Sequence, residues 1–196
     1  RSALAVSADD ADNNIAIGTT AMGGADVSGT HNIALGTDSM DALTSGACNI
    51  AMGKNALGAA TDNENNIAIG ISALAASVND GDCNIAIGKF AMGVTDVSGS
   101  NNVAIGTSAG DALLAGHSNV MVGDRAGGAL DSGFQNVAVG GSALIGSESG
   151  CQNIAIGISA LSGAVTGLNN IVLGTDAADA VTSGACNIAL GKNALG

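Results

Sequence analysis

One short phrase occurs eleven times along the 196-residue chain, and no other feature restricts the possible folds as strongly. The phrase has five positions. Asn comes first, a large apolar residue second, usually Ala third, another large apolar residue fourth and Gly fifth, as in the Asn-Ile-Ala-Ile-Gly of 14–18. Successive phrases begin 17 or 18 residues apart. A fixed short period is typical of repeat architectures, in which each unit is stabilised by its neighbours. The phrases begin at Asn14, Asn32, Asn49, Asn66, Asn84, Asn102, Asn119, Asn136, Asn153, Asn170 and Asn187.

Each unit predicts a strand, a glycine turn, a short apolar segment and a polar turn. The strand phrase alternates large and small residues, which is the period of a strand. Four or five residues cannot fold alone, so the units must stack. We therefore expect an all-β chain, a parallel β-solenoid (β-roll) of about eleven 17–18-residue rungs. With strands ~4.8 Å apart it would be a rod roughly 50 Å long. In-register stacking places the eleven asparagines in a hydrogen-bonded ladder of side-chain amides.

The two faces of each strand predict two different environments. We expect Ile15, Ile17 and their equivalents to point inward as the core. The residue between them would then point outward, as a stripe of small apolar residues suited to close approach by a second subunit. The alternative is a flattened coil in which this column faces the opposite wall of the same chain. The predicted interface comprises Ala16, Ala34, Ala51, Ala68, Ala86, Ala104, Met121, Ala138, Ala155, Val172 and Ala189.

Composition excludes several classes of partner. The net charge is −12, and the aromatic residues are Phe90 and Phe134 alone. Nucleic acid is a poor partner, because phosphate binding needs clustered Lys and Arg and base stacking needs aromatic rings. The sequence contains no run of about 18 apolar residues, so it does not predict membrane insertion. Neither end carries an atypical capping unit, so we expect residues 1–196 to be a single repeat solenoid cut from a longer fibre.

The residues capable of chemistry are few and scattered. His31 and His117 lie five rungs apart, so the sequence predicts no zinc site, no cofactor and no catalytic residue, and the chain is not expected to be an enzyme. Aspartates such as Asp41, Asp111 and Asp179 are expected in solvated turns, with calcium binding as the alternative.

The cysteines are expected to have no partner within their own chain. Cys48 and Cys83 lie two rungs apart, as do Cys151 and Cys186. Two rungs separate Cα atoms by about 9.6 Å, and a disulfide tolerates at most ~7 Å. The four residues are therefore either small turn residues or partners of cysteines in another subunit.

The repeat also resembles a known family. Asn-Ile-Ala-Ile-Gly followed by a Ser/Thr/Asn-Ala-Leu segment is similar to the head repeats of the YadA-like trimeric autotransporter adhesins. It is also similar to related repeats in the tail fibres of bacteriophages, notably those of marine cyanobacteria. The resemblance extends over the whole chain, although the units here are longer than those of adhesin heads. It implies left-handed parallel β-rolls, with three chains wrapped around one axis.

Together these features predict a structural segment, the shaft or head of an extracellular fibre on a cell surface or virion, assembled as a homo-oligomer and, by resemblance, a homotrimer. The alternatives are a homopolymeric filament and an adhesin that binds a cell-surface receptor or glycan directly. Ice binding would require a uniform Thr column. The residues after the strand glycines include Thr19, Lys54 and Ile71, so the sequence argues against it.

Overall fold

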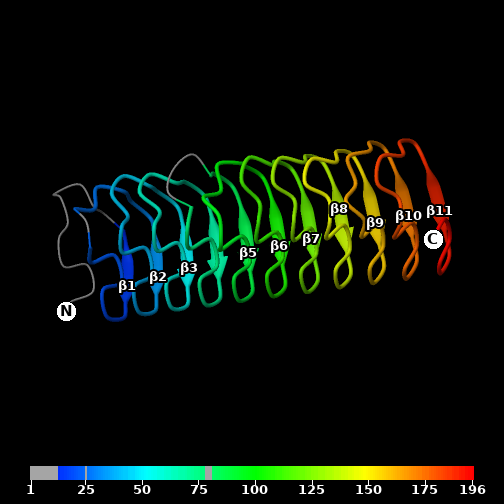
Figure 1. Cartoon of the computed structure of the whole chain (residues 1–196). Coiled ribbons are helices and arrows are strands. Elements are labelled where there is room, and N and C mark those ends of the chain that lie inside the picture. Colours follow the sequence, from blue (N-terminus) through cyan, green and yellow to red (C-terminus); the bar gives the residue numbers. More distant parts are fainter. Residues whose placement is uncertain (1–12, 25, 78–80) are drawn as a thin grey trace.

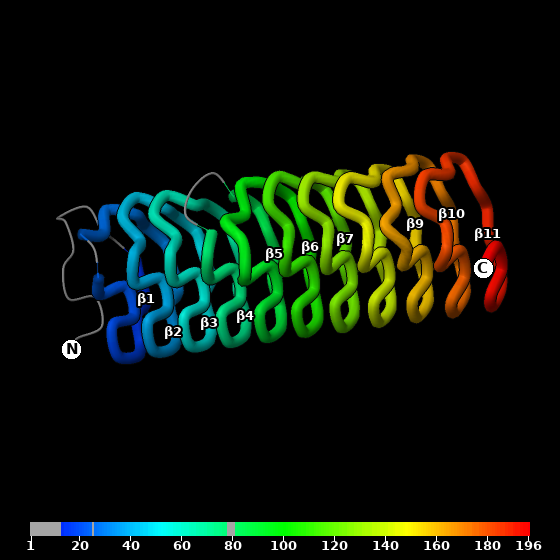
Figure 2. The backbone as a smooth tube through the Cα atoms, in the orientation of Figure 1, coloured from blue at the N-terminus to red at the C-terminus, as the bar shows by residue number. Residues whose placement is uncertain are grey.

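The chain forms a β-solenoid of about ten turns, seen in a computed structural model that describes residues 13–24, 26–77 and 81–196. Figures 1 and 2 show the coils stacked in chain order along one axis. Each coil contributes one three-residue strand to a single wall, and we number the rungs by their strands. The strands are β1 Ile15–Ile17, β2 Ile33–Leu35, β3 Ile50–Met52, β4 Ile67–Ile69, β5 Ile85–Ile87, β6 Val103–Ile105, β7 Val120–Val122, β8 Val137–Val139, β9 Ile154–Ile156, β10 Ile171–Leu173 and β11 Ile188–Leu190.

The eleven strands form one parallel sheet in the order β1 to β11, which confirms the predicted all-β parallel solenoid. Their register pairs equivalent residues, so that Ile67 lies beside Ile85 and Ala68 beside Ala86. Backbone hydrogen bonds between rungs continue into the turns. The Asn55 N–H donates to the Thr37 carbonyl at 2.9 Å, and the Ser72 N–H donates to the Lys54 carbonyl at 2.9 Å. Stacking of whole coils, and not of strands alone, therefore holds the rod together.

The inward face of each strand carries the asparagine and the alanine, and this reverses our expectation for the two strand faces. The middle residues of β2 to β9, seven alanines and Met121, are 0 % exposed within the single chain, and Val172 and Ala189 are 0 % and 2 % exposed. Ala16 in the first rung is partly buried and packs on the same core. A side chain enclosed by its own chain cannot contact a second subunit, so the predicted alanine interface is wrong. The alternative, a flattened coil with the alanines facing the opposite wall, is the arrangement found.

The physical reason for the reversal is the asparagine two residues before each alanine. Side chains two apart on a strand share a face. Asn49 is 0 % exposed and makes hydrogen bonds inside the coil, which places Ala51 inside as well and Ile50 and Met52 outside. The core is thin, because the alanine column packs against the Leu and Met side chains that follow each strand turn.

Rung 7 shows how strictly the core volume is conserved. Most rungs have Leu or Met eight residues after the strand Asn, but Gly110 and Gly127 hold this position in rungs 6 and 7. A Cβ added to either glycine would lie 2.8 Å or 2.7 Å from Met121 Sδ. Met121, the one methionine in the alanine column, thus fills the volume that two missing side chains leave.

The backbone is held in unusual conformations at the turns. Three residues in each rung have a φ near +60° and occupy the left-handed region, as Cys48, Asn55 and Leu57 do in rung 3. The strand glycines are more extreme. Gly88 has a φ of +137°, and a Cβ there would lie 2.4 Å from the carbonyl oxygen of Gly106 in the next rung. These turns therefore bring each coil close to the next and require glycine at this point.

A candidate assembly face on the outer side of the sheet

The outer side of the sheet is a continuous surface of aliphatic side chains, which we call the aliphatic face. It takes the first and third residue of every strand, and each of these side chains is exposed or half-buried. The parallel register aligns them into two columns along the rod. The members are Ile15, Ile17, Ile33, Leu35, Ile50, Met52, Ile67, Ile69, Ile85, Ile87, Val103, Ile105, Val120, Val122, Val137, Val139, Ile154, Ile156, Ile171, Leu173, Ile188 and Leu190.

This exposure is large for a water-soluble surface. Ten members of the face are more than a third exposed, from Val120 at 36 % to Ile188 at 65 %. Single exposed aliphatic residues are ordinary, but contiguous apolar patches above a few hundred Å² mark sites of contact with another surface. The face extends along all eleven strands without interruption, which makes it the strongest candidate for a functional site in the described part of the chain.

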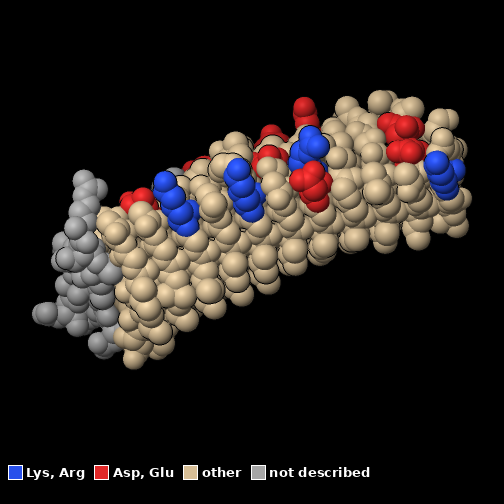
Figure 3. All heavy atoms as spheres, turned by 90° about the horizontal axis from the view of Figure 1, so that it is seen from below, with Lys and Arg blue, Asp and Glu red and all other residues tan. Residues whose placement is uncertain are grey.

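No charged residue interrupts the aliphatic face, because every strand consists of aliphatic residues and alanine. The described lysines and arginine, Lys54, Lys89, Arg125 and Lys192, all lie in the turn that follows a strand. Figure 3 shows Lys and Arg side chains in one row along the rod, with acidic side chains near them and a broad uncharged surface beside the row. Arg125 Nε lies 3.3 Å from Asp124 Oδ2 in an exposed ion pair.

The asparagine ladder lies directly behind the start of the aliphatic face, as the sequence predicted. Asn102 Oδ1 accepts one hydrogen bond from the backbone N–H of Asn119 at 3.0 Å and another from Asn119 Nδ2 at 3.1 Å. Asn102 Nδ2 donates to the Gly116 carbonyl at 2.9 Å. The link from a side-chain oxygen to the next asparagine amide joins all eleven residues from Asn14 to Asn187. It anchors the start of each strand and so keeps the two aliphatic columns aligned.

The cysteines and histidines lie in the turn that precedes each strand. All four cysteines are free thiols, with Cys48, Cys83 and Cys186 exposed and Cys151 buried. The ring of His117 stacks on that of Phe134 in the next rung, with centroids 5.1 Å apart and planes 5° apart. Sequence reasoning missed this pair, although both residues lie two positions before a strand Asn and so belong to one column.

Two of the turn aspartates are less solvated than expected. Burial raises the pKa of Asp41, and the nearby Asp38 carboxylate raises it further. Burial also raises the pKa of Asp111. A hydrogen bond from Ser108 and the charge of Arg125 lower this pKa, but burial has the larger effect. The described residues include no group of three or more His, Cys, Asp or Glu side chains placed to hold a metal ion.

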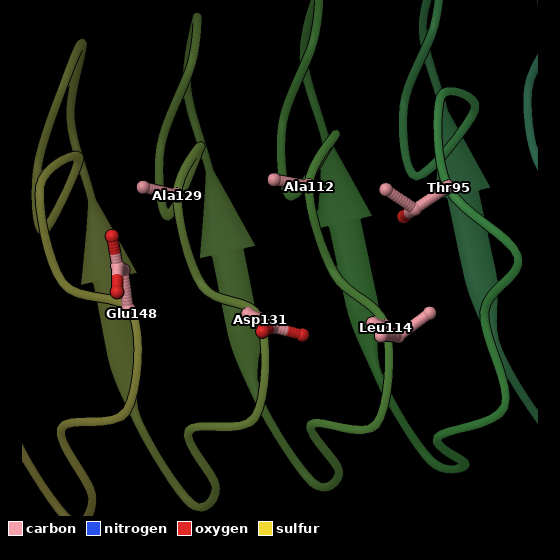
Figure 4. Close-up of a pocket in the computed structure, with 6 residues that line it drawn as sticks. All are labelled: Thr95, Ala112, Leu114, Ala129, Asp131 and Glu148. Atoms are coloured by element: carbon pink, nitrogen blue, oxygen red, sulfur yellow. The ribbon is translucent and has the colours of Figure 1, made fainter.

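A groove of about 460 Å³ runs across the turns of rungs 5 to 8. Figure 4 shows its lining residues in two rows on segments that pass in front of the strands, with Thr95, Ala112 and Ala129 in one and Leu114, Asp131 and Glu148 in the other. The groove is shallow and open to solvent, and it belongs to the wall opposite the sheet.

The comparisons with known proteins add no relative to this description. Neither a scan against protein-family models nor searches of curated proteins and of solved structures found a match. The part of the chain that the structure describes contains no helical segment with the length and hydropathy of a membrane span.

Proposed function

We propose that this chain is a non-enzymatic structural segment of an extracellular fibre, in which copies associate side by side through the aliphatic face. The observation that carries the proposal is the aliphatic face itself, two unbroken columns of exposed or half-buried Ile, Val, Leu and Met without a charge. The acidic turns keep the outside of such an assembly soluble, because the chain has a net charge of −12.

The energy available from the aliphatic face is of the size that stable association requires. Burying a whole Val, Leu or Ile side chain contributes roughly 1.5–3 kcal/mol, so a residue one-third to two-thirds exposed contributes about 0.5–2 kcal/mol. Ten members of the face exceed one-third exposure. They offer roughly 7–14 kcal/mol per copy, and the half-buried members add to this. Association costs about 4–15 kcal/mol, which three mutually buried faces can offset.

The resemblance to YadA-like adhesin heads and phage tail fibres supports the finer details. We assign the assembly as a homotrimer of left-handed coils and place the fibre outside the cell, on a cell surface or a virion. In this arrangement the three aliphatic faces point at a common axis, and the turns and the opposite wall form the outer surface.

Light scattering and sedimentation of the purified chain, with a substitution in the middle of the face, test the proposal. We expect a defined oligomer, and we expect Ile87→Lys to convert it to a monomer that keeps the circular dichroism of the β-solenoid. The control is Val94→Lys, since Val94 is 62 % exposed but lies outside the face. It should leave the oligomer intact.

Each other outcome has a definite meaning. A monomeric wild-type chain refutes association through the face, as does an oligomer that Ile87→Lys leaves intact. Open-ended growth identifies a homopolymeric filament in place of the fibre segment. A direct adhesin would instead show saturable binding to cells or glycans by the monomeric Ile87→Lys variant.

A further inference from the structure

Two columns of turn residues border the aliphatic face, one on each side. The start rim contains the residues two positions before each strand Asn, and the end rim those five positions after it. Residues of the same rung on the two rims are seven positions apart. From rung 2 to rung 11 the start rim is Thr30, Ala47, Glu64, Asp82, Ser100, His117, Phe134, Cys151, Leu168 and Ala185, and the end rim is Thr37, Lys54, Ile71, Lys89, Thr107, Asp124, Gly141, Ile158, Thr175 and Lys192.

The rims differ in charge. The four described Lys and Arg residues lie on the end rim or directly beside it, together with Asp124 on this rim and Asp38 and Asp176 beside it. The start rim has no Lys or Arg among its described residues, and it carries the carboxylates Glu64 and Asp82. His117 is the one imidazole in the column, and His31 lies just beside it in rung 2. Asp82 Oδ1 accepts a hydrogen bond from the Glu64 amide at 2.7 Å, which holds this carboxylate at the rim.

The symmetry of an assembly decides which rims meet. When rods lie parallel around an axis along their length, with their sheets facing that axis, rotation brings the start rim of one copy beside the end rim of its neighbour. When two rods face each other antiparallel, start rim meets start rim. In that case Glu64 and Asp82 meet no Lys or Arg, and the lysines of the two end rims share a border.

Matching of the rims rung by rung favours the parallel arrangement. In rung 5, Asp82 on the start rim corresponds to Lys89 on the end rim, and the Lys89 ammonium lies over the Phe90 ring, 5.1 Å from its centroid. In rung 8 the half-buried Phe134 corresponds to Gly141. A Cβ built on Gly141 would have Asp124 O, at 4.0 Å, as its nearest contact, so the end rim is hollow at this level. No described rung from 2 to 11 places like charges at the two rim positions.

We propose that the start rim of each copy docks against the end rim of the next, parallel and in register, with Asp82 paired to Lys89 and the His117–Phe134 stack seated at Gly141. This inference rests on the proposed association through the aliphatic face and adds its orientation and register. The aliphatic face supplies the affinity but is nearly uniform along the rod, so it does not select one register. The residues of the two rims differ from rung to rung, so contacts between rims can select one register.

Disulfide trapping tests the docking on the full chain, in a background with Cys48, Cys83 and Cys186 replaced by Ser and Cys151 by Ala. Asp82→Cys and Lys89→Cys are introduced together and oxidised with copper phenanthroline. Within one chain the two positions flank an extended strand segment roughly 13 Å long, which a disulfide of Cα separation below ~7 Å cannot bridge. We expect a covalent closed oligomer from the double variant and no crosslink from either single variant. Ala47→Cys with Lys54→Cys, in rung 3, repeats the test where no side-chain ion is lost from the start rim.

The mismatched pair Ala47→Cys with Lys89→Cys is the register control, because two rungs place these positions about 9.6 Å apart along the axis. It should stay uncrosslinked. Crosslinked dimers from the single variants would establish antiparallel rods and overturn the inference. An oligomer by light scattering that neither matched pair crosslinks would also overturn it, while leaving association through the aliphatic face intact. A monomer before oxidation would instead refute the proposed function itself.

Discussion

Truncation of one asparagine in the ladder, Asn102→Ala, should destabilise the solenoid far more than its single side chain suggests. The Asn102 side chain is 0 % exposed. It accepts from the Asn119 amide at 3.0 Å and donates to the Gly116 carbonyl at 2.9 Å. Alanine leaves this N–H and this carbonyl buried without those partners. Each such group costs about 1–3 kcal/mol, so the free energy of unfolding should fall by about 2–6 kcal/mol.

Urea unfolding followed by far-ultraviolet circular dichroism, at one protein concentration throughout, measures this loss, and hydrogen exchange of the Asn119 amide locates it. The control is Asn101→Gly, because Asn101 is exposed and has a φ of +63° that glycine adopts freely. It should change stability by less than about 1 kcal/mol. A loss below about 1 kcal/mol for Asn102→Ala, or unchanged protection of the Asn119 amide, would refute the view that the ladder bonds hold the rungs together.

Three further perturbations test other parts of the structure. Gly88→Ala should cost at least about 3 kcal/mol in urea unfolding, since its Cβ would lie 2.4 Å from the Gly106 carbonyl oxygen; a loss below about 1 kcal/mol would contradict this steric argument. Met121→Ala should lower the free energy of unfolding by about 2–5 kcal/mol, because it opens a cavity. Adding Gly127→Leu should recover part of this loss, because it restores the Ala and Leu pattern of other rungs. Equal stabilities of the single and double variants would contradict the compensation. Asp111→Asn should raise stability at neutral pH, because burial raises the pKa of Asp111 in the folded state and the folded chain therefore loses stability as its carboxyl ionises. The gain in stability should vanish as the pH falls below 3.8, the ordinary pKa of an aspartate. A gain that persists in acid would show that it does not come from ionisation of Asp111.

Much of the fold was predictable from the spacing of one phrase. Repetition of the Asn14 phrase at eleven nearly evenly spaced positions predicted parallel stacking, the register and the amide ladder, because all three follow from placing equivalent residues above one another. The orientation of the strand faces was not predicted correctly, although Asn49 and Ala51 could have shown it. The predicted ladder did not say on which face of the strand the asparagine lies, whereas its hydrogen bonds require it to point into the coil.

The repeat alone therefore establishes a rod of stacked strands with apolar residues on both sides of its sheet, since period and alternation are properties of the chain itself. It does not establish which side is the core. That depends on how close the opposite wall comes, and in this molecule the space between the walls is filled by small and medium side chains such as Ala68 and Leu74. Folding of the coil on itself leaves Ile67 and Ile69 on the outside, and with them a candidate assembly face in place of the predicted alanine stripe.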